Sequence, residues 1–437
     1  MKVLHINYER ESHTMSKVKT TGSAVLMAAL AFSPLVISTS HAATGGPRDS
    51  YISLHSPVLD GTNTSDAVNN QKMADGWVAK DWFGSGLIFQ VSFAPVGSTI
   101  NLTYNVKNKS GVVLPYTPVN LRINKGYSEA ASIVEVDGIK TKGIDRPPFD
   151  QANVTHRTDA FGNVTFALKN LDLESSGEKE PESFTSIPIF SDDKLDRLHS
   201  QMLPEVNSEQ ADHSVISEFH YYAPTTKIVV PATKPSILLV TPKLDATNSI
   251  ANAATGVKQA YAPAGGDLVV VYKVIGDDGK TGVPGLALTL KINDGKSTLT
   301  ATTDAFGFAA FTVKNSDTKP NAAPVKPTSA IPAASSAFAK ITPELAGVTP
   351  TTAEGVEFHY YRGISATAAK SGKNYVVSVA IEGAAGKTAA VSVTGATKSS
   401  VRLSSPRQIV PVKVTAGAKI VTVVIDGKTY TAKVTVK

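Results

Sequence analysis

A pentapeptide with the residue types of a binding site, Glu-Phe-His-Tyr-Tyr, occurs twice in the chain, at 218–222 and 357–361. Adjacent side chains of an extended strand point to opposite faces, so the histidine and the second tyrosine share a face with the glutamate. We expect that face to point outward and the other, with the phenylalanine and the first tyrosine, to pack in the core. The candidate binding residues are therefore His220, Tyr222, His359 and Tyr361. They could bind a metal, a glycan or a neighbouring domain, or could simply form the exposed face of a closing strand; a zinc site would need a third ligand that no nearby spacing supplies.

Oxygen-bearing side chains stand three residues apart at the start of each half of the chain. The residues that could coordinate calcium are Asp60, Asn63, Asp245 and Asn248. Calcium takes about six to eight oxygen ligands, so these residues would need further partners. An Asx turn, in which the carboxylate accepts a nearby backbone N–H, explains the same spacing without a metal. The sequence indicates no other cofactor.

The two tryptophans, Trp77 and Trp82, lie in a segment that has no counterpart in the second half of the chain. Charged residues stand among them at 75, 80 and 81. Aromatic rings beside polar groups form many glycan sites, and packing of a domain edge is the alternative.

Catalytic motifs are missing from the sequence. It contains no Gly-x-Ser-x-Gly elbow, no His-Glu-x-x-His and no phosphate-binding glycine loop. With 0 cysteines it also lacks thiol nucleophiles, thiolate zinc sites and disulfides. These features predict a protein that is not an enzyme and has no catalytic residues; a glycan-active enzyme is the weakest alternative.

An internal duplication organises these candidate residues. Ser-Pro-Val-Leu-Asp-Gly-Thr-Asn at 56–63 recurs as Thr-Pro-Lys-Leu-Asp-Ala-Thr-Asn at 241–248, and Thr-Asp-Ala-Phe-Gly occurs at 158–162 and 303–307. Repetition in a fixed order predicts homologous domains. The expected parts are a signal peptide at 1–42, a first repeat with long insertions at 43–233, a second repeat at 234–363 and a basic C-terminal β module at 364–437.

The repeats have the period of β-strands. Apolar residues alternate, and turn clusters such as Asp-Asp-Gly-Lys at 277–280 interrupt them every 8 to 15 residues or so. The pattern predicts an all-β chain of tandem antiparallel sandwiches. In the Thr-Asp-Ala-Phe-Gly element we expect the aspartate to cap a turn and the glycine to supply a positive φ before the next strand.

The second repeat resembles the bacterial Ig-like domains of the invasin and intimin type. The resemblance rests on Gly-Val-Pro-Gly-Leu-Ala-Leu-Thr-Leu at 282–290, Ala-Thr-Thr-Asp-Ala-Phe-Gly at 301–307 and the strand at 309–313, with weaker traces at Pro118 and 158–166 in the first repeat. It implies tandem Ig-like β-sandwiches of the kind that form surface stalks. No segment of the sequence resembles the membrane barrel or the cysteine-bearing lectin-like domain of invasins, so we do not expect the resemblance to extend to their receptor binding.

Residues 1–42 have the pattern of an export signal. Lys17 and Lys19 precede an apolar run at 24–37, which ends before Ser-His-Ala at 40–42. We expect cleavage before Ala43, with Met15 a better signal start than Met1, and no transmembrane helix in the mature chain.

Two long segments interrupt the first repeat, at about 126–155 and, rich in acid, at about 172–212; the second has a Pro/Ala-rich counterpart at 319–352. We expect the acidic segment to lie outside the sandwich core. The C-terminal 74 residues carry 11 lysines and arginines against 2 acidic residues. This excess predicts attraction to an anionic surface or to the acidic segment of a second copy.

Together these features predict an exported, extracellular or cell-surface protein with a structural or adhesive role and no enzymatic activity. The alternative is a soluble secreted protein that binds glycans or anionic polymers. Expected partners are an envelope polymer, a glycan, another surface protein or, by self-association, a second copy; nucleic acid is not expected.

Overall fold

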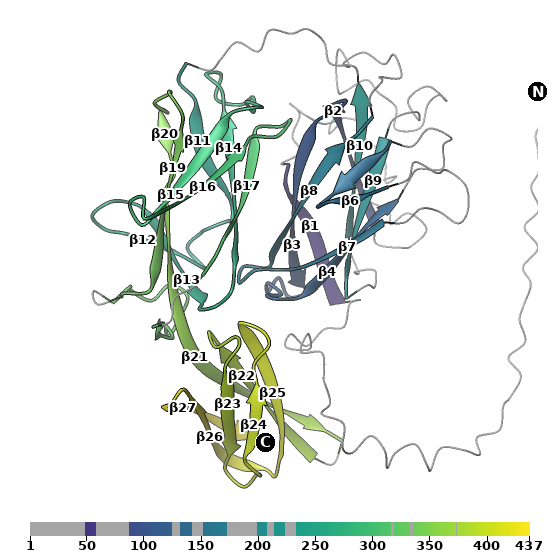
Figure 1. Cartoon of the computed structure of the whole chain (residues 1–437). Coiled ribbons are helices and arrows are strands. Elements are labelled where there is room, and N and C mark those ends of the chain that lie inside the picture. The colour runs from purple at the N-terminus through teal and green to yellow at the C-terminus, as the bar shows by residue number, and fades with distance from the viewer. Residues whose placement is uncertain are drawn as a thin grey trace, which may run out of the picture. The chain divides into compact units, whose positions relative to one another are not determined.

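The computed structural model describes residues 49–57, 87–124, 132–141, 152–172, 199–207, 214–222, 233–315, 319–332, 335–372 and 374–437. The chain divides into Met1–Thr39 and Ser40–Lys437, and everything described below belongs to the second unit. Every named element of this part is a β-strand, arranged in several sheets (Figure 1). The predicted all-β class is therefore confirmed. Among the described residues no helix is long and apolar enough to cross a membrane.

The first repeat is built from two five-stranded sheets. One sheet has the order β1 (Ser50–Ser56), β3 (Thr99–Asn108), β8 (Asn163–Asn170), β5 (Val134–Val136), β6 (Ile139–Lys140). The other has the order β2 (Leu87–Pro95), β10 (Ser214–Tyr222), β9 (His199–Val206), β4 (Pro118–Asn124), β7 (Ala152–Arg157).

The second repeat follows the same plan. One sheet has the order β17 (Phe308–Val313), β14 (Leu268–Ile275), β11 (Ser236–Thr241), β20 (Thr352–Ala353). The other has the order β12 (Ile250–Ala251), β13 (Lys258–Pro263), β21 (Val356–Ser371), β19 (Phe338–Leu345), β15 (Ala287–Ile292), β16 (Ser297–Thr302), and β18 (Asn321–Ala322) also pairs with β21. Strands β1, β3 and β8 therefore correspond to β11, β14 and β17, and β10 corresponds to the first half of β21.

The strand that closes each repeat pairs on both of its edges. β10 pairs in parallel with β2 and antiparallel with β9, and β21 pairs in parallel with β13 and antiparallel with β19. The Glu-Phe-His-Tyr-Tyr pentapeptides thus lie on interior strands of their sheets. That position decides how much of their polar face solvent can reach.

The cores contain the residues that the alternation predicts. Phe219 and Tyr221 are 0% exposed, and Phe358 and Tyr360 are 0% and 2% exposed. The expectation that these four side chains pack inward is confirmed. Each fully buried aromatic side chain of this size stabilises the fold by about 2 to 3 kcal/mol through the apolar area it removes from water.

The acidic segment at 172–212 is not wholly outside the core, so that prediction was wrong at its C-terminal end. Residues 199–206 form β9, a central strand of its sheet, and Met202 in it is 0% exposed. The Pro/Ala-rich segment likewise contains β19, which pairs with both β15 and β21. Both strands contain a proline and several polar residues, so the sequence alone does not predict them as strands. Residues 173–198 lie outside the described part of the chain.

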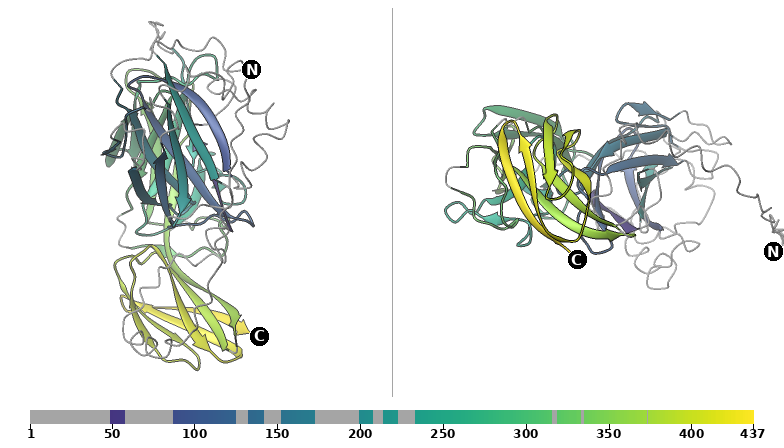
Figure 2. Two further views of the ribbon diagram at one scale, coloured as in Figure 1. Left: turned by 90° about the vertical axis from the view of Figure 1, so that its right-hand side faces the viewer. Right: turned by 90° about the horizontal axis from the view of Figure 1, so that it is seen from below.

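The C-terminal module is continuous with the second repeat. β21 runs through the boundary expected at 363–364 and pairs beyond it with β22 (Asn374–Glu382), which pairs with β25 (Arg407–Val414) (Figure 2). The module's second sheet has the order β24 (Ser399–Arg402), β23 (Thr388–Val393), β26 (Gly417–Ile425), β27 (Lys428–Val436). Asp426 and Gly427 have φ of 50° and 77°, as the predicted Asp-Gly hairpin requires.

Candidate functional site

The two Thr-Asp-Ala-Phe-Gly elements form tight turns held by their aspartates. Asp159 Oδ1 accepts hydrogen bonds from the backbone N–H of Phe161 at 2.8 Å and of Asn163 at 2.9 Å. Asp304 Oδ1 accepts the equivalent bonds from Phe306 and Phe308, both at 2.9 Å. The glycines that follow, at 162 and 307, have φ of 76° and 81°. The predicted capped turn with a positive-φ glycine is confirmed in both copies.

The second carboxylate oxygen of each aspartate accepts a hydrogen bond from the backbone of the other repeat. Asp159 Oδ2 accepts a hydrogen bond from the Val269 N–H at 3.0 Å, and Asp304 Oδ2 accepts one from the Asn101 N–H at 2.7 Å. Asn101 on β3 and Val269 on β14 occupy equivalent positions of the two repeats. The contact is therefore reciprocal, as in an interface with two-fold symmetry.

The phenylalanines of the two turns also contact the opposite repeat reciprocally. The Phe161 ring lies 5.8 Å from the Phe358 ring, and the Phe306 ring lies 6.2 Å from the Phe219 ring, both in tilted geometry. Each turn thus presents its ring to the closing strand of the other repeat. Aromatic pairs of this kind contribute about 0.5 to 1.5 kcal/mol beyond their buried area.

Burial changes the acidity of the two aspartates. Removal from solvent raises the pKa of Asp159 to about 7 and that of Asp304 to about 6, although backbone hydrogen bonds oppose the shift. Both carboxyls are almost fully enclosed, at 3% and 4% exposed. A buried carboxylate is costly unless donors surround it, and here the donors come from two repeats at once.

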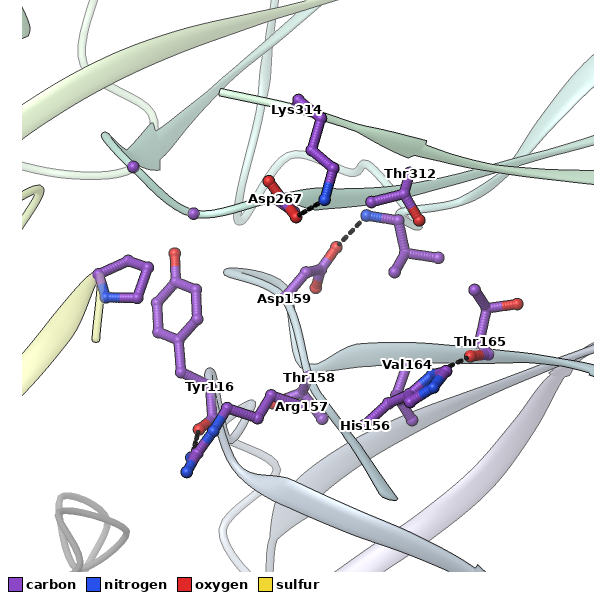
Figure 3. A pocket seen from close by; sticks show the side chains of 14 residues that line it. Tyr116, His156, Arg157, Thr158, Asp159, Val164, Thr165, Asp267, Thr312 and Lys314 are labelled. Carbon is purple, nitrogen blue, oxygen red and sulfur yellow. Dashed lines mark hydrogen bonds and ion pairs between the residues drawn. The ribbon is translucent and has the colours of Figure 1, made fainter. Parts of the chain in front are cut away.

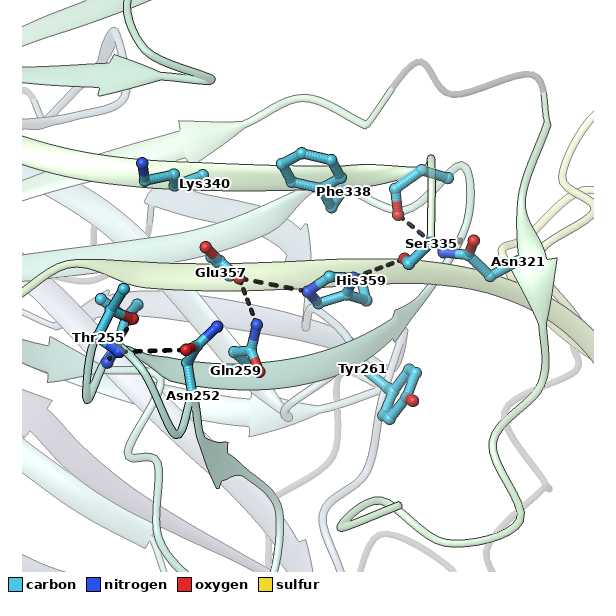
Figure 4. A network of polar contacts seen from close by, with 12 residues as sticks. Asn252, Thr255, Gln259, Tyr261, Asn321, Ser335, Phe338, Lys340, Glu357 and His359 are labelled. Atoms are coloured by element: carbon cyan, nitrogen blue, oxygen red, sulfur yellow. Dashed lines mark hydrogen bonds and ion pairs between the residues drawn. The ribbon is translucent and has the colours of Figure 1, made fainter. Parts of the chain in front are cut away.

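The polar face of the second pentapeptide is not outward, and this expectation was wrong for His359. Its side chain is 4% exposed; Nδ1 lies 2.7 Å from Ser335 Oγ and Nε2 lies 3.5 Å from Glu357 Oε2 (Figure 4). Gln259 on β13 donates to the same Glu357 oxygen at 2.5 Å. Burial lowers the pKa of His359, so the imidazole is neutral at pH 7.

The cause of this burial is the pairing of β21 on both edges. Strands β13 and β19 flank the row, and the Phe338 ring stacks on the imidazole at a centroid distance of 5.7 Å. In the first repeat Glu218, on the same face as His220, is also buried, at 7% exposed. The side chains of His220 and Tyr222 lie outside the described residues. Tyr361 is half-buried and donates to Glu382 Oε2 of the C-terminal module at 3.1 Å.

Serine, histidine and glutamate in one row are also the residue types of an acyl-transfer triad. The backbone N–H of Ser335, a donor that such sites use to stabilise an oxyanion, donates instead to Pro332 O at 2.9 Å. The geometry favours a buried hydrogen-bond network over a nucleophile.

The calcium candidates of the second repeat form an Asx turn. Asp245 Oδ1 accepts hydrogen bonds from the N–H of Thr247 at 2.8 Å and from its hydroxyl at 2.6 Å, and Asn248 Oδ1 accepts from the Asp245 N–H at 2.9 Å. No group of three His, Asp or Glu residues in the described part of the chain could hold a metal. Asp60, Asn63, Trp77 and Trp82 lie outside the described residues, so the calcium and glycan hypotheses for them stay predictions.

A cavity of about 500 Å³ opens beside one of the two aspartate contacts (Figure 3). The first repeat contributes Tyr116, His156, Arg157 and Asp159, and the second contributes Asp267 and Lys314. Apart from Asp159, these residues were not predicted, because none of them belongs to the recurring motifs described above. A signal was present, however: aligning the two halves places Tyr116 opposite a glycine, Gly285.

No protein-family model matches the chain, and no sequence among the curated proteins matches it. Solved structures with similarity include a 1.5-MDa bacterial ice-binding adhesin, at 13% identity over 79% of this chain and 91% of that chain, with a TM-score of 0.18. Invasin, described as a bacterial integrin-binding protein, is similar at 13% identity over 79% of this chain and 58% of the other, with a TM-score of 0.18. The native α2-macroglobulin of Escherichia coli is similar at 10% identity over 89% and 22%, also with a TM-score of 0.18. TM-scores this low carry no argument about function.

Proposed function

We propose that this chain is an exported, non-enzymatic structural or adhesive protein of the cell surface. Its two Ig-like repeats act as one rigid body, and its basic C-terminal module attaches that body to an anionic envelope polymer.

The reciprocal junction is the observation that supports this role most strongly. Each repeat gives a carboxylate oxygen and a phenylalanine ring to the other, so neither repeat is complete at this surface alone. Repeats joined only by a linker would reorient freely, as inter-domain interfaces with few contacts allow. A body held in one orientation suits a spacer that must present or support a surface.

The charge of the C-terminal module supports the attachment. Its lysines at 370, 398, 413, 428 and 433 are exposed. Its only two carboxylates are already engaged, Glu382 with Arg407 at 3.1 Å and Asp426 with Lys387 at 3.3 Å. The exposed lysines are therefore available for a polyanion, whose attraction falls with ionic strength.

The experiment replaces exposed lysines and leaves the continuous strand β21 intact. Lys413, Lys428 and Lys433 are changed to glutamine in the full chain, and the control changes Lys258, Lys280 and Lys296, equally exposed lysines of the second repeat. Cells that produce each form are fractionated at about 0.1 M and about 1 M salt. We expect the wild type and the control to remain with the envelope at low salt, and the module variant to be released.

Retention of the module variant at low salt, or of the wild type at high salt, would contradict attachment by charge. Release of the wild type under every condition would favour the second candidate, a soluble binding protein for glycans. The cavity at the junction is the feature that favours this second function.

A further inference from the structure

The junction cavity lies on one side of an interface whose two sides are equivalent. Each lining residue that belongs to a repeat therefore has a counterpart on the other side, and only Pro406 of the C-terminal module does not. Arg157 at the end of β7 pairs with Pro118, and Thr302 at the end of β16 pairs with Ala287 in the same register. Arg157 thus corresponds to Thr302.

The same correspondence assigns counterparts to the other polar residues of the cavity. His156, Asp267 and Tyr116 correspond to Ala301, Thr99 and Gly285. Arg157 and these three groups therefore occur only on the side with the cavity, whereas Lys314 has a lysine counterpart, Lys169. The turn residues that form the contact between the repeats are, in contrast, the same on both sides: aspartate, phenylalanine and glycine.

Tyr116 adopts a backbone conformation that favours glycine. Its φ is 55°, and the φ of Gly285 in the equivalent turn is 75°. Both residues donate their N–H to the equivalent carbonyl, of Thr158 at 3.0 Å and of Thr303 at 2.9 Å. A non-glycine residue in this region is strained, so the first repeat carries strain at the position where it places an aromatic ring.

The phenol of Tyr116 is enclosed and unpaired. The residue is 8% exposed, and its Oη has no hydrogen-bond partner among the described residues. Gly266 makes room for it, because a Cβ at that position would lie 2.7 Å from Oη. A buried hydroxyl without a partner destabilises the fold, and a bound polar group would recover that free energy by pairing with it.

The cavity offers both charge and paired polar atoms. Arg157 is exposed and its Nη1 donates to Tyr116 O at 3.0 Å; no carboxylate forms an ion pair with it among the described residues. On the wall formed by the second repeat, Asp267 and Lys314 form an ion pair at 2.5 Å (Figure 3). The site therefore has one uncompensated cation, together with a pair that can both accept and donate hydrogen bonds.

We propose that this cavity binds an acidic sugar unit of a polysaccharide, with its carboxylate on Arg157 and its hydroxyls on the Asp267–Lys314 pair. An arginine binds a carboxylate through two parallel N–H donors, which gives direction as well as charge. Sugar hydroxyls both donate and accept, and so match the ion pair. The Tyr116 ring supplies an apolar wall, and the volume lies within the range of small-ligand pockets.

Other ligands fit these groups less well. A small inorganic anion would meet the carboxylate of Asp267 as well as Arg157. A neutral sugar would leave the guanidinium without a counterion. Sugar binding here does not depend on surface attachment, because the groups that would hold the sugar belong to the two repeats and the C-terminal module contributes only Pro406 to the lining.

The test titrates the folded full chain by calorimetry with three probes: an oligomer of galacturonate, an oligomer of galactose and inorganic phosphate. We expect binding of the acidic oligomer, at least 10-fold weaker binding of the neutral one, and no saturable binding of phosphate. Arg157→Thr installs the counterpart residue and should weaken binding of the acidic oligomer at least 10-fold. The control is Lys169→Thr, which removes one exposed cation from the counterpart position of Lys314 and should leave binding unchanged.

Three results would overturn the proposal: no binding of the acidic oligomer at millimolar concentration, equal weakening by both substitutions, or phosphate binding as tight as that of the sugar. Tyr116→Phe keeps the ring and removes only the hydroxyl, so it separates loss of a contact from loss of the fold. It should weaken binding a few-fold with an unchanged circular dichroism spectrum; unchanged affinity would contradict the part assigned to the phenol.

Discussion

The first repeat has tyrosine at 116 where the second has glycine at 285, yet both turns make the same backbone hydrogen bond. At the aspartates the two repeats do not differ at all: each uses one carboxylate oxygen for its own turn and the other for its neighbour. The comparison separates two kinds of position. Residues that hold the repeats together are alike in both copies, whereas Tyr116, Arg157 and Asp267 beside the contact have no charged or aromatic counterpart in the other copy.

The largest effect should come from the buried rings that receive the exchanged phenylalanines. Phe219→Ala and Phe358→Ala each remove a side chain that is 0% exposed, and should each lower the free energy of unfolding by about 3 to 5 kcal/mol. Urea denaturation of the full chain measures both. Losses that differ by more than about 2 kcal/mol would show that the repeats are not energetically equivalent.

The next largest loss in the free energy of unfolding should come from replacing the two turn aspartates. Asp159→Ala and Asp304→Ala each leave three backbone N–H groups without an acceptor, two in the variant's own repeat and one in the other. We expect a loss of about 2 to 4 kcal/mol for each, since every orphaned buried donor carries its own penalty. The double variant should lose less than the sum, because the first substitution already loosens the shared surface. If the losses of the two single variants added in full in the double variant, the two turns would be energetically independent.

The same carboxyls make stability depend on pH. Burial raises their pKa to about 6 for Asp304 and about 7 for Asp159, so the folded chain binds protons more tightly than the unfolded chain. The resulting stabilisation is complete below about pH 4 and is lost as the pH rises through these two values. From about pH 4 to pH 8 this contribution should decline by a few kcal/mol in the wild type and should be missing from the Asp159→Ala, Asp304→Ala double variant. Equal pH profiles would contradict the shifted acidities.

A smaller effect is expected at the buried histidine row. His359→Ala should cost about 1 to 3 kcal/mol, because it removes a 4% exposed ring and leaves the Ser335 hydroxyl without its partner, although Glu357 keeps its bond from Gln259. Ser335→Ala removes a half-buried hydroxyl and leaves His359 Nδ1 without its partner, so it should cost about 1 to 2 kcal/mol. If His359→Ala left the free energy of unfolding unchanged, the side chain would instead point outward, as the sequence predicted.

The smallest loss of stability should come from the turn at Gly285, the position that corresponds to Tyr116. A Cβ on Gly285 would meet nothing within 4 Å, so Gly285→Ala should cost only the strain of its φ of 75°, about 1 kcal/mol. Gly282→Ala is the contrast, since its Cβ would lie 1.9 Å from Phe306 O. Thermal unfolding should show a clear drop for the second variant and a small one for the first.

Local rules were sufficient where one element decides the outcome. The inward faces at Phe219 and Phe358 follow from period two, and the Thr-Asp-Ala-Phe-Gly turns follow from Asx and glycine chemistry. His359 was misplaced because its burial depends on which strands pair with β21, and β19 has a weak strand pattern. Sequence alternation gives the face of a strand but does not say what covers that face.

The candidate site was out of reach of the sequence for a related reason. A single aspartate satisfies its own turn with Oδ1, and nothing local states that Oδ2 reaches a strand 110 residues away in one copy and 203 in the other. The duplicated phenylalanine was a usable clue, since a capped turn needs no aromatic ring. The cavity residues share no motif, and only the packing of the repeats brings Tyr116 and Asp267 together.

Amide hydrogen exchange of Asn101 and Val269 tests the reciprocal junction most directly, because each amide reports on an aspartate of the other repeat. Asp159→Ala should speed exchange of the Val269 amide at least 10-fold, and Asp304→Ala should do the same for Asn101. Protected amides in the core of the repeat that receives the contact, such as Tyr272 or Tyr104, should change much less. If each substitution instead sped exchange only within its own repeat and left the other repeat's amide protected, the two repeats would not hold each other, and the rigid body would be refuted.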